Sequence, residues 1–288
     1  MNKKLILIVC TLLLIAGCTG SPRDKAPITD VDIRKGLQGL TMEFTKNAPP
    51  ERVFEDDIFP IAVRLRNQGA SDINAIEVGH KDGDGAAKAD NVNGVLVFGL
   101  EKTYVGLVGE EGKEGIIFNI NGKSISNPNG DEEIITLNAQ TKKIGAQSET
   151  QSSTILATAC YPYKTILGAS VCIDTDIYGE RRGQKACSIA DLKFTEGQGA
   201  PAAITKIETR MLPQDNNLVQ PHFLILIENK GNGEVVSLSE VENACTGKAL
   251  DYRAFNTVII KASLSNKPLD CRINKDDPKP AVIRLRDK

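Results

Sequence analysis

The fold of this chain is decided by the stretch Ile61-Ala62-Val63-Arg64-Leu65-Arg66-Asn67-Gln68-Gly69. Large apolar residues alternate with small or charged ones, as in a half-buried β-strand, and Asn-Gln-Gly ends the run with residues that favour a turn. The stretch Phe223-Leu224-Ile225-Leu226-Ile227-Glu228-Asn229-Lys230-Gly231 is a second apolar, strand-like run that ends in Asn-x-Gly, and a proline, Pro60 or Pro221, precedes each copy. Such an internal sequence repeat predicts two similar β-structures in one chain.

Strand-like patterns dominate the rest of the chain as well. Apolar and polar residues alternate through residues 40–44. Residues 116–120 and 123–126 flank Asn121-Gly122, a dipeptide whose tolerance of positive φ favours a tight hairpin. A short capped helix is indicated only around residues 239–242. The sequence therefore predicts an all-β fold.

The two echoing strands resemble the central strand of immunoglobulin-like domains of the CARDB type, whose signature is an extended apolar run that ends in Asn-x-Gly. The whole chain is similar to archaeal-type surface lipoproteins, in which the segments Gly39–Phe44 and Cys160–Thr165 recur. The resemblance implies two immunoglobulin-like β-sandwiches, residues 36–155 and 200–288. It also implies a cysteine-bearing hairpin or loop segment, residues 156–199, that joins them. The class brings no established function with it.

The N-terminal segment has the features of a secretion signal. Lys3 and Lys4 precede the apolar run Leu5–Ile15, which is too short to span a hydrocarbon core that needs roughly 20 apolar residues. The end of the run, Leu12-Leu13-Leu14-Ile15-Ala16-Gly17-Cys18, resembles the lipobox of secreted lipoproteins. In that family a peptidase cuts before the cysteine and a lipid is joined to its sulfur.

The lipobox resemblance implies a signal peptide at residues 1–17, a lipid on Cys18 and a polar tether at residues 18–35. The protein would then be anchored in the cell membrane and face the outside of the cytoplasmic membrane. Two alternatives stay open at this point. One is an ordinary cleaved signal with Cys18 unmodified, and the other is an uncleaved anchor.

Three cysteines lie in or near the connecting segment, Cys160, Cys172 and Cys187, and two more, Cys245 and Cys271, lie in the second predicted sandwich. An oxidising compartment outside the cytoplasm favours disulfides. The preferred pairing joins Cys172 to Cys187 and Cys245 to Cys271, and leaves Cys160 unpaired. Cys160 could also displace one partner, and the sequence does not choose between these pairings.

The search for catalytic patterns found none, so the sequence predicts no enzyme activity and no cofactor beyond the lipid. The chain has only two histidines, His80 and His222, and no C-x-x-C pair or G-x-S-x-G elbow. Gly122-Lys123-Ser124 ends like a phosphate loop, but Ile117 stands where the first glycine belongs.

Composition narrows the possible partners. Removal of Lys3 and Lys4 with the signal leaves 33 of the 35 basic residues against 37 acidic ones, a formal net charge of −4. The chain has no polybasic arm, which argues against nucleic acid. It has no tryptophan and only 5% aromatic residues, so it lacks the platforms on which sugars stack. Another cell-surface protein is the expected partner.

The glycine-rich and acidic loops supply the other candidate site residues. Asp82, Asp84 and Asp90 offer alternate carboxylates of the kind that bind calcium, but a third loop ligand and the closing glutamate are missing, and a solvated loop explains them better. The candidate interaction residues are Gly109, Glu110, Glu111, Asp174, Asp176, Arg181 and Arg182.

Two functions are consistent with these patterns. The first is a non-catalytic, lipid-anchored envelope protein that acts as a spacer or protein-interaction module. The alternative is an accessory or solute-binding lipoprotein of a membrane transporter or of a surface-appendage assembly system. A solute binder needs a concave pocket with converging polar groups, and the all-β tandem pattern favours the first function.

Overall fold

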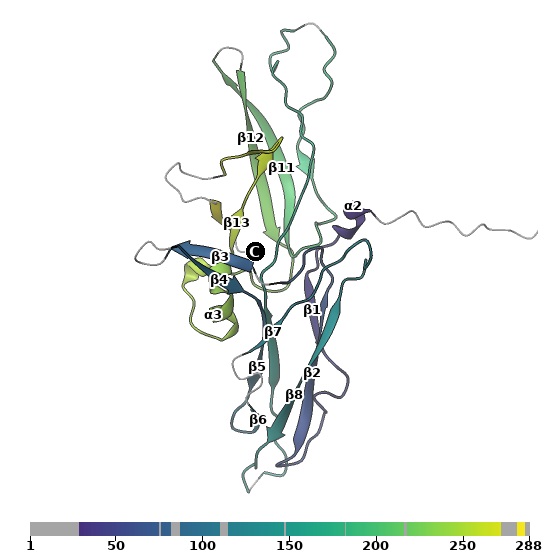
Figure 1. Ribbon diagram of the computed structural model, residues 1–288, viewed down its shortest axis with the longest axis vertical. Coiled ribbons are helices and arrows are strands. Elements are labelled where there is room, and N and C mark those ends of the chain that lie inside the picture. Colours follow the sequence, from purple (N-terminus) through teal and green to yellow (C-terminus); the bar gives the residue numbers. More distant parts are fainter. Residues whose placement is uncertain are drawn as a thin grey trace, which may run out of the picture.

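The computed structural model describes residues 29–74, 76–81, 87–109, 115–146, 148–181, 183–215, 218–271 and 281–285. These residues form mostly β-strands in several antiparallel sheets, with few and short helices, so the all-β prediction is confirmed (Figure 1). Within these ranges no helix has the length and apolar character needed to cross a membrane.

Two sheets form the lower half of the molecule, which we call the sheet body (Figure 1). The first sheet has the order β1 (Leu40–Phe44), β2 (Ile58–Asn67), β8 (Glu132–Thr141) and β6 (Val105–Leu107). The second has the order β7 (Ile116–Phe118), β5 (Gly94–Leu100) and β9 (Ile155–Cys160). Every pairing within them is antiparallel.

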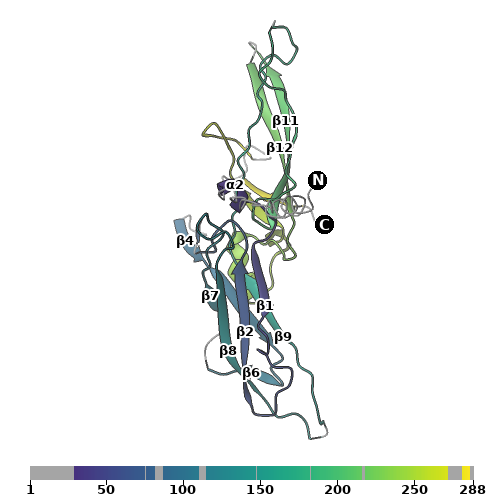
Figure 2. The same cartoon turned by 90° about the vertical axis from the view of Figure 1, so that its right-hand side faces the viewer.

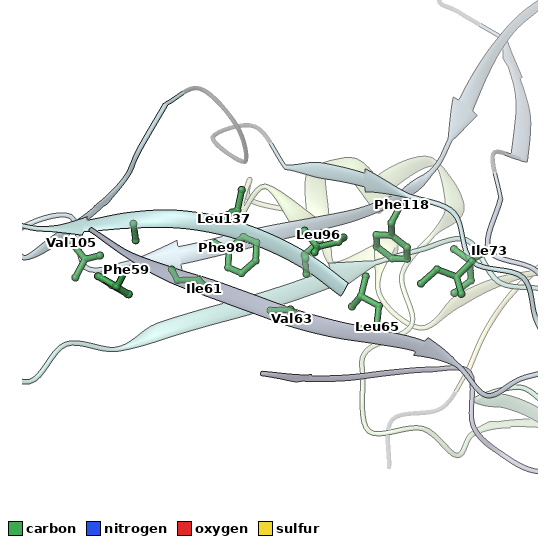
Figure 3. Packing of buried hydrophobic residues seen from close by; sticks show 13 residues of the cluster. Phe59, Ile61, Val63, Leu65, Ile73, Leu96, Phe98, Val105, Phe118 and Leu137 are labelled. Carbon is green, nitrogen blue, oxygen red and sulfur yellow. The ribbon is translucent and has the colours of Figure 1, made fainter. Parts of the chain in front are cut away.

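The core of the sheet body lies between these two sheets (Figure 3). Ile61, Val63 and Leu65 of β2 are 0% exposed, which confirms the period-2 prediction for the fold-deciding strand. From the facing sheet, Leu96 and Phe98 of β5 reach the same cluster. Burial of this apolar surface is the main stabilising term for the body.

The C-terminal half is dominated by a long hairpin of β11 (Ala202–Gln214) and β12 (Leu218–Asn229), which forms the upper half of Figure 1. The strand β10 (Leu192–Lys193) pairs with the outer edge of β11. The remaining pairs are β3 (Ile76–Lys81) with β4 (Ala87–Val92), β13 (Thr257–Ile260) with β16 (Ala281–Arg284), and β14 (Ser263–Leu264) with β15 (Lys267–Pro268). The helices are α2 (Asp30–Ile33), η1 (Leu238–Glu240), α3 (Val241–Cys245) and η2 (Tyr252–Ala254).

Several local predictions are corrected by these elements. The tether predicted to extend to residue 35 contains α2, whose Ile33 is buried. The prediction of a hairpin at Asn121-Gly122 is wrong, because β7 pairs with β5 and the Lys123 N–H donates to the carbonyl oxygen of Gly69. The short helix near residues 239–242 is confirmed by η1 and α3.

The boundaries of the connecting segment also change. Residues 156–160 belong to β9 and pair with β5 in the sheet body, so the connection begins at Tyr161. The run from Thr165 to Ile173 contains no strand, and so makes no hairpin with β9. It leaves the body and follows the β11–β12 hairpin, where the Thr165 hydroxyl donates to the carbonyl oxygen of Ala202.

The echoed Asn-x-Gly turns have the same hydrogen-bond pattern in both halves. The Asn67 Oδ1 accepts from the Gly69 N–H at 3.1 Å, and its Nδ2 donates to the Ser71 carbonyl at 2.8 Å. The Asn229 Oδ1 accepts from the Gly231 N–H at 3.0 Å, and its Nδ2 donates to the Gly233 carbonyl at 2.8 Å. The asparagine side chain thus closes each turn by replacing backbone partners.

The first of these turns is buried beneath other segments. Asn67 is 0% exposed, and its Nδ2 also donates to the carbonyl oxygen of Ile120 at 3.1 Å. The Tyr163 hydroxyl accepts from the Ser71 N–H at 3.3 Å and donates to the carbonyl of Gly199 at 3.1 Å. We call this contact region between residues 67–71, 161–163 and 196–201 the junction. It joins the sheet body to the start of the hairpin.

The junction explains why the segments Gly39–Phe44 and Cys160–Thr165 matter to the fold. The Leu40 N–H donates to the Tyr161 hydroxyl at 3.3 Å, so the two segments are in direct contact. The Tyr161 and Tyr163 rings meet edge to face, with centroids 5.7 Å apart. A Cβ added to Gly69 would overlap the Tyr163 hydroxyl and lie 2.6 Å from the carbonyl oxygen of Gly199. Only glycine fits this position without displacing the tyrosine.

The junction should weaken at alkaline pH. Burial raises the pKa of Tyr163 to about 12, and it raises the pKa of Tyr161 as well. An unfolded tyrosine ionises near pH 10, so the stability contributed by neutral Tyr163 is complete below pH 10 and is lost as the pH rises to about 12. Denaturant unfolding at pH 7, 10 and 12 measures this loss. The Tyr163→Phe variant should have a lower free energy of unfolding at pH 7 and should lose less of it between pH 10 and 12. If the free energy of unfolding falls equally with pH in the two proteins, ionisation of Tyr163 is not the cause of the alkaline loss.

Candidate functional site: the disulfide-closed tip loop

The described part of the chain contains two disulfides, and one of them differs from the prediction. The predicted bridge between Cys172 and Cys187 is confirmed, and the Cα atoms of these residues are 5.9 Å apart. Cys160 is bonded to Cys245, with Cα atoms 5.6 Å apart, and Cys271 is a free thiol. The predicted Cys245–Cys271 bridge and the unpaired Cys160 are therefore wrong.

The position of α3 is the physical reason for the observed pairing. The helix lies on the outer face of β5 and β9, where Val241 is 4% exposed and Cys245 is 5% exposed. The Cys245 sulfur lies 3.3 Å from the carbonyl oxygen of Val95 in β5. Cys160 is paired with Val95 across the β5–β9 ladder and so occupies the same spot. The bridge fastens the C-terminal half to the sheet body.

The second disulfide closes a loop at the far end of the molecule, which we call the tip loop, residues 172–187. The loop and the turn of the β11–β12 hairpin reach the same end, opposite the sheet body (Figures 1 and 2). Tyr178 in the loop is 74% exposed, and Leu218 at the hairpin turn is 63% exposed. Two apolar side chains are thus presented to solvent at this end.

The carboxylates of the tip loop hold the loop in shape. The Asp176 carboxylate accepts from the Glu180 N–H at 2.8 Å and from the Arg181 N–H at 3.1 Å. The Asp174 carboxylate accepts from the Asp176 N–H at 2.8 Å and lies 2.6 Å from the Lys185 ammonium. The hydrogen bond from Lys185 lowers the pKa of Asp174. These contacts line a hollow of about 260 Å³ inside the loop.

The return from the tip loop is attached to β11. The Asp191 carboxylate lies 3.1 Å from the Lys206 ammonium and 3.7 Å from the Arg210 guanidinium. Glu208 lies 2.6 Å from Lys206 and 3.2 Å from Arg210, so the four side chains form one network. Its charges are partly exposed, so each pair contributes little alone, but together they fix where the loop returns.

The predicted site residues are only partly brought together. Asp174, Asp176 and Arg181 share the tip loop, and the Arg181 guanidinium lies 3.4 Å from the Thr175 hydroxyl. Gly109 lies after β6 in the sheet body, far along the chain from the tip. Cys18, Asp82, Asp84, Glu110, Glu111 and Arg182 lie outside the described residues, and the side chain of Asp90 does as well. In the described part of the chain, no group of three or more His, Cys, Asp or Glu side chains is arranged to hold a metal.

Sequence reasoning missed Tyr163, Tyr178 and Lys185. Tyr178 lies within the predicted disulfide loop, so its position between two bonded cysteines was an available signal for exposure. Lys185 carries a charge opposite to the two loop aspartates and completes the ion pair with Asp174. Tyr163 had no local signal, because its partners lie 92 and 36 residues away.

The internal bonds of the tip loop can be tested by changing Asp176. Asp176→Ala should speed hydrogen exchange at the Glu180 and Arg181 amides by about fivefold, since a lost hydrogen bond costs about 1 kcal/mol. Hydrogen exchange resolved to single amides measures the effect. Glu180→Ala, at an exposed residue of the same loop, is the matched control and should leave both amides unchanged. Equal exchange in the two variants would show that the carboxylate does not order the loop.

The site and the fold together define an all-β protein, disulfide-bonded within its described residues, that presents an ordered loop at one end of a long hairpin. Comparison of the chain with protein-family models, curated proteins and solved structures found no significant match.

Proposed function

We propose that this protein is a non-catalytic, lipid-anchored component of the cell envelope that acts as a spacer or protein-interaction module. The observation that carries the proposal is the tip loop. It is closed by a disulfide, ordered by Asp174 and Asp176, and placed at the opposite end from the sheet body. A preorganised loop loses little conformational entropy on binding, which favours recognition of a macromolecule.

The proposal includes the finer description of the fold. The sheet body has four strands in one sheet and three in the other around a shared core, and this arrangement supports an immunoglobulin-like sandwich of the CARDB type. The repeated Asn-x-Gly bonding supports a second, related sandwich in residues 200–288. An experimental structure with two packed sheets in residues 200–288 would support the second sandwich, and a single-layer hairpin would contradict it.

The proposed location rests on the N-terminal sequence. The apolar run that ends in Ala16-Gly17-Cys18 supports lipid attachment at Cys18 outside the cytoplasmic membrane. Two disulfides fit an oxidising compartment. Mass spectrometry of the mature N-terminal peptide tests this part, and an unmodified cysteine or a different first residue would contradict it.

Site-specific photocrosslinking on intact cells tests the binding role. A photoreactive amino acid at Tyr178 should capture a defined surface protein, because this side chain is 74% exposed on the tip loop. The matched control is Phe54, an aromatic residue that is 84% exposed on a loop of the sheet body and should capture nothing specific. Capture of a transporter or appendage subunit would favour the accessory-lipoprotein alternative. Identical products from both positions would contradict a binding role for the tip.

A further inference from the structure

The N-terminal segment enters the molecule at the junction, between its two ends. The Gly36 N–H donates to the carbonyl oxygen of Glu196 at 2.7 Å, and the Gly36 carbonyl accepts from the Gly199 N–H at 2.7 Å. Helix α2 precedes this contact and lies at mid-height in both views (Figures 1 and 2). A lipid joined to the chain before α2 would therefore pull on the middle of the molecule.

Two arms of similar length extend in opposite directions from this point. Strand β2 ends at the junction with Asn67, and its 10 residues span about 33 Å of the sheet body. Strand β11 starts at the junction with Ala202, and its 13 residues span about 43 Å toward the tip. Figure 1 shows the two strands on opposite sides of α2.

The junction contacts fix the two arms relative to each other. The Tyr163 hydroxyl bridges Ser71 of the body turn and Gly199 at the start of the hairpin arm. The Ala70 N–H also donates to the Gly199 carbonyl, at 2.8 Å. The disulfide Cys160–Cys245 adds a covalent link between the body and the C-terminal half. These contacts hold the start of the hairpin arm against the sheet body, and the disulfide holds α3 against β9.

The chain between the proposed lipid and α2 is short compared with either arm. Residues 18 to 28 are 11 residues, which reach at most about 40 Å when fully extended. An upright posture would lift the junction by a whole arm, about 33 Å or more, and would need a nearly fully stretched tether.

We propose that the anchored protein lies along the membrane surface, held at its middle, with the tip loop presented sideways close to the bilayer. This inference rests on the proposed lipid at Cys18. It also defines the class of partner, because a loop held at this height meets the outer part of a neighbouring membrane protein or lipoprotein. A partner in a distant outer layer would be out of reach of the tip.

Energy transfer between the protein and the bilayer tests the posture. The full-length lipidated protein carries a donor dye, attached through a noncanonical amino acid, at Tyr178 on the tip loop or at Lys143 beside Asp56 in the sheet body. Phosphatidylcholine vesicles carry a headgroup-linked acceptor, and the dye pair has half-maximal transfer at a distance similar to one arm. Transfer should be strong and similar at the two positions. A flexible insert of about 20 residues between Ala26 and Pro27 should reduce both signals, since the longer chain lets the molecule move further from the bilayer.

The outcomes of energy transfer and of vesicle flotation distinguish a wrong posture from a missing lipid anchor. Strong transfer at one position with almost none at the other would mean an upright posture, and would overturn the inference while leaving the lipid anchor intact. Cys18→Ser is the matched control and should not float with vesicles. If the unaltered protein also fails to float, or if Cys18→Ser floats equally well, the anchor and the inference are both wrong.

Discussion

Replacing Asn67 with alanine should lower the free energy of unfolding by about 3 kcal/mol or more, because each buried polar group left unpaired costs roughly 1–3 kcal/mol. The Asn67 side chain is 0% exposed and makes hydrogen bonds to the backbone of Gly69, Ser71 and Ile120. Its removal leaves the buried Gly69 N–H and the part-buried Ser71 carbonyl without this partner, and it opens a cavity. The Ile120 carbonyl loses one donor but keeps its hydrogen bond from the Ile73 N–H. Denaturant unfolding monitored by circular dichroism measures the change.

The matched control for this change is Asn229→Ala. Asn229 closes the same kind of turn through hydrogen bonds with Gly231 and Gly233. The hydrogen bond that its side-chain Nδ2 donates to the Gly233 carbonyl is exposed to solvent. Water can replace the lost partner, so we expect a cost of about 1 kcal/mol or less. Equal losses for the two variants would show that the shared turn geometry, rather than the burial of Asn67, sets the cost.

Removing the long-range disulfide should cost about 4 kcal/mol of stability. Cys160 and Cys245 are 85 residues apart, and a loop of this length gains about 4–5 kcal/mol in the chain-entropy account of disulfides. Cys172 and Cys187 are 15 residues apart, so the same account gives about 3 kcal/mol for the tip loop. Unfolding of the two double variants, each with both cysteines of one pair replaced by serine, measures the difference.

Cys271→Ser controls for the loss of a thiol as such. Cys271 forms no disulfide, and its replacement should change stability by less than about 0.5 kcal/mol. A non-reducing peptide map should find Cys160 linked to Cys245 and Cys172 linked to Cys187. A peptide that links Cys245 to Cys271 would overturn the pairing, whatever the stability measurements show.

Several features of the fold could be predicted from local sequence. The alternation in residues 61–65 required one face of β2 to be buried, because strand side chains point to opposite faces in turn. The Asn-x-Gly turns were predictable because an asparagine side chain bonds to backbone groups within four residues. The Cys172–Cys187 bridge spans a short loop, so closing it costs little chain entropy and few arrangements of the backbone compete.

The sequence by itself thus determined the alternating strand of residues 61–65, the Asn-x-Gly turns and the short disulfide loop, all of which depend on neighbours along the chain. Only the tertiary structure decided that α3 docks on β5 and β9, and hence that Cys245 meets Cys160 instead of Cys271. It also decided that the Asn67 side chain is buried, whereas the hydrogen bond from Asn229 to Gly233 is exposed to solvent. The segments that cover Asn67 lie around Ile120 and Tyr163, which are 53 and 96 residues away along the chain. Contacts over such separations depend on how whole sheets pack, and a local pattern carries no record of that packing.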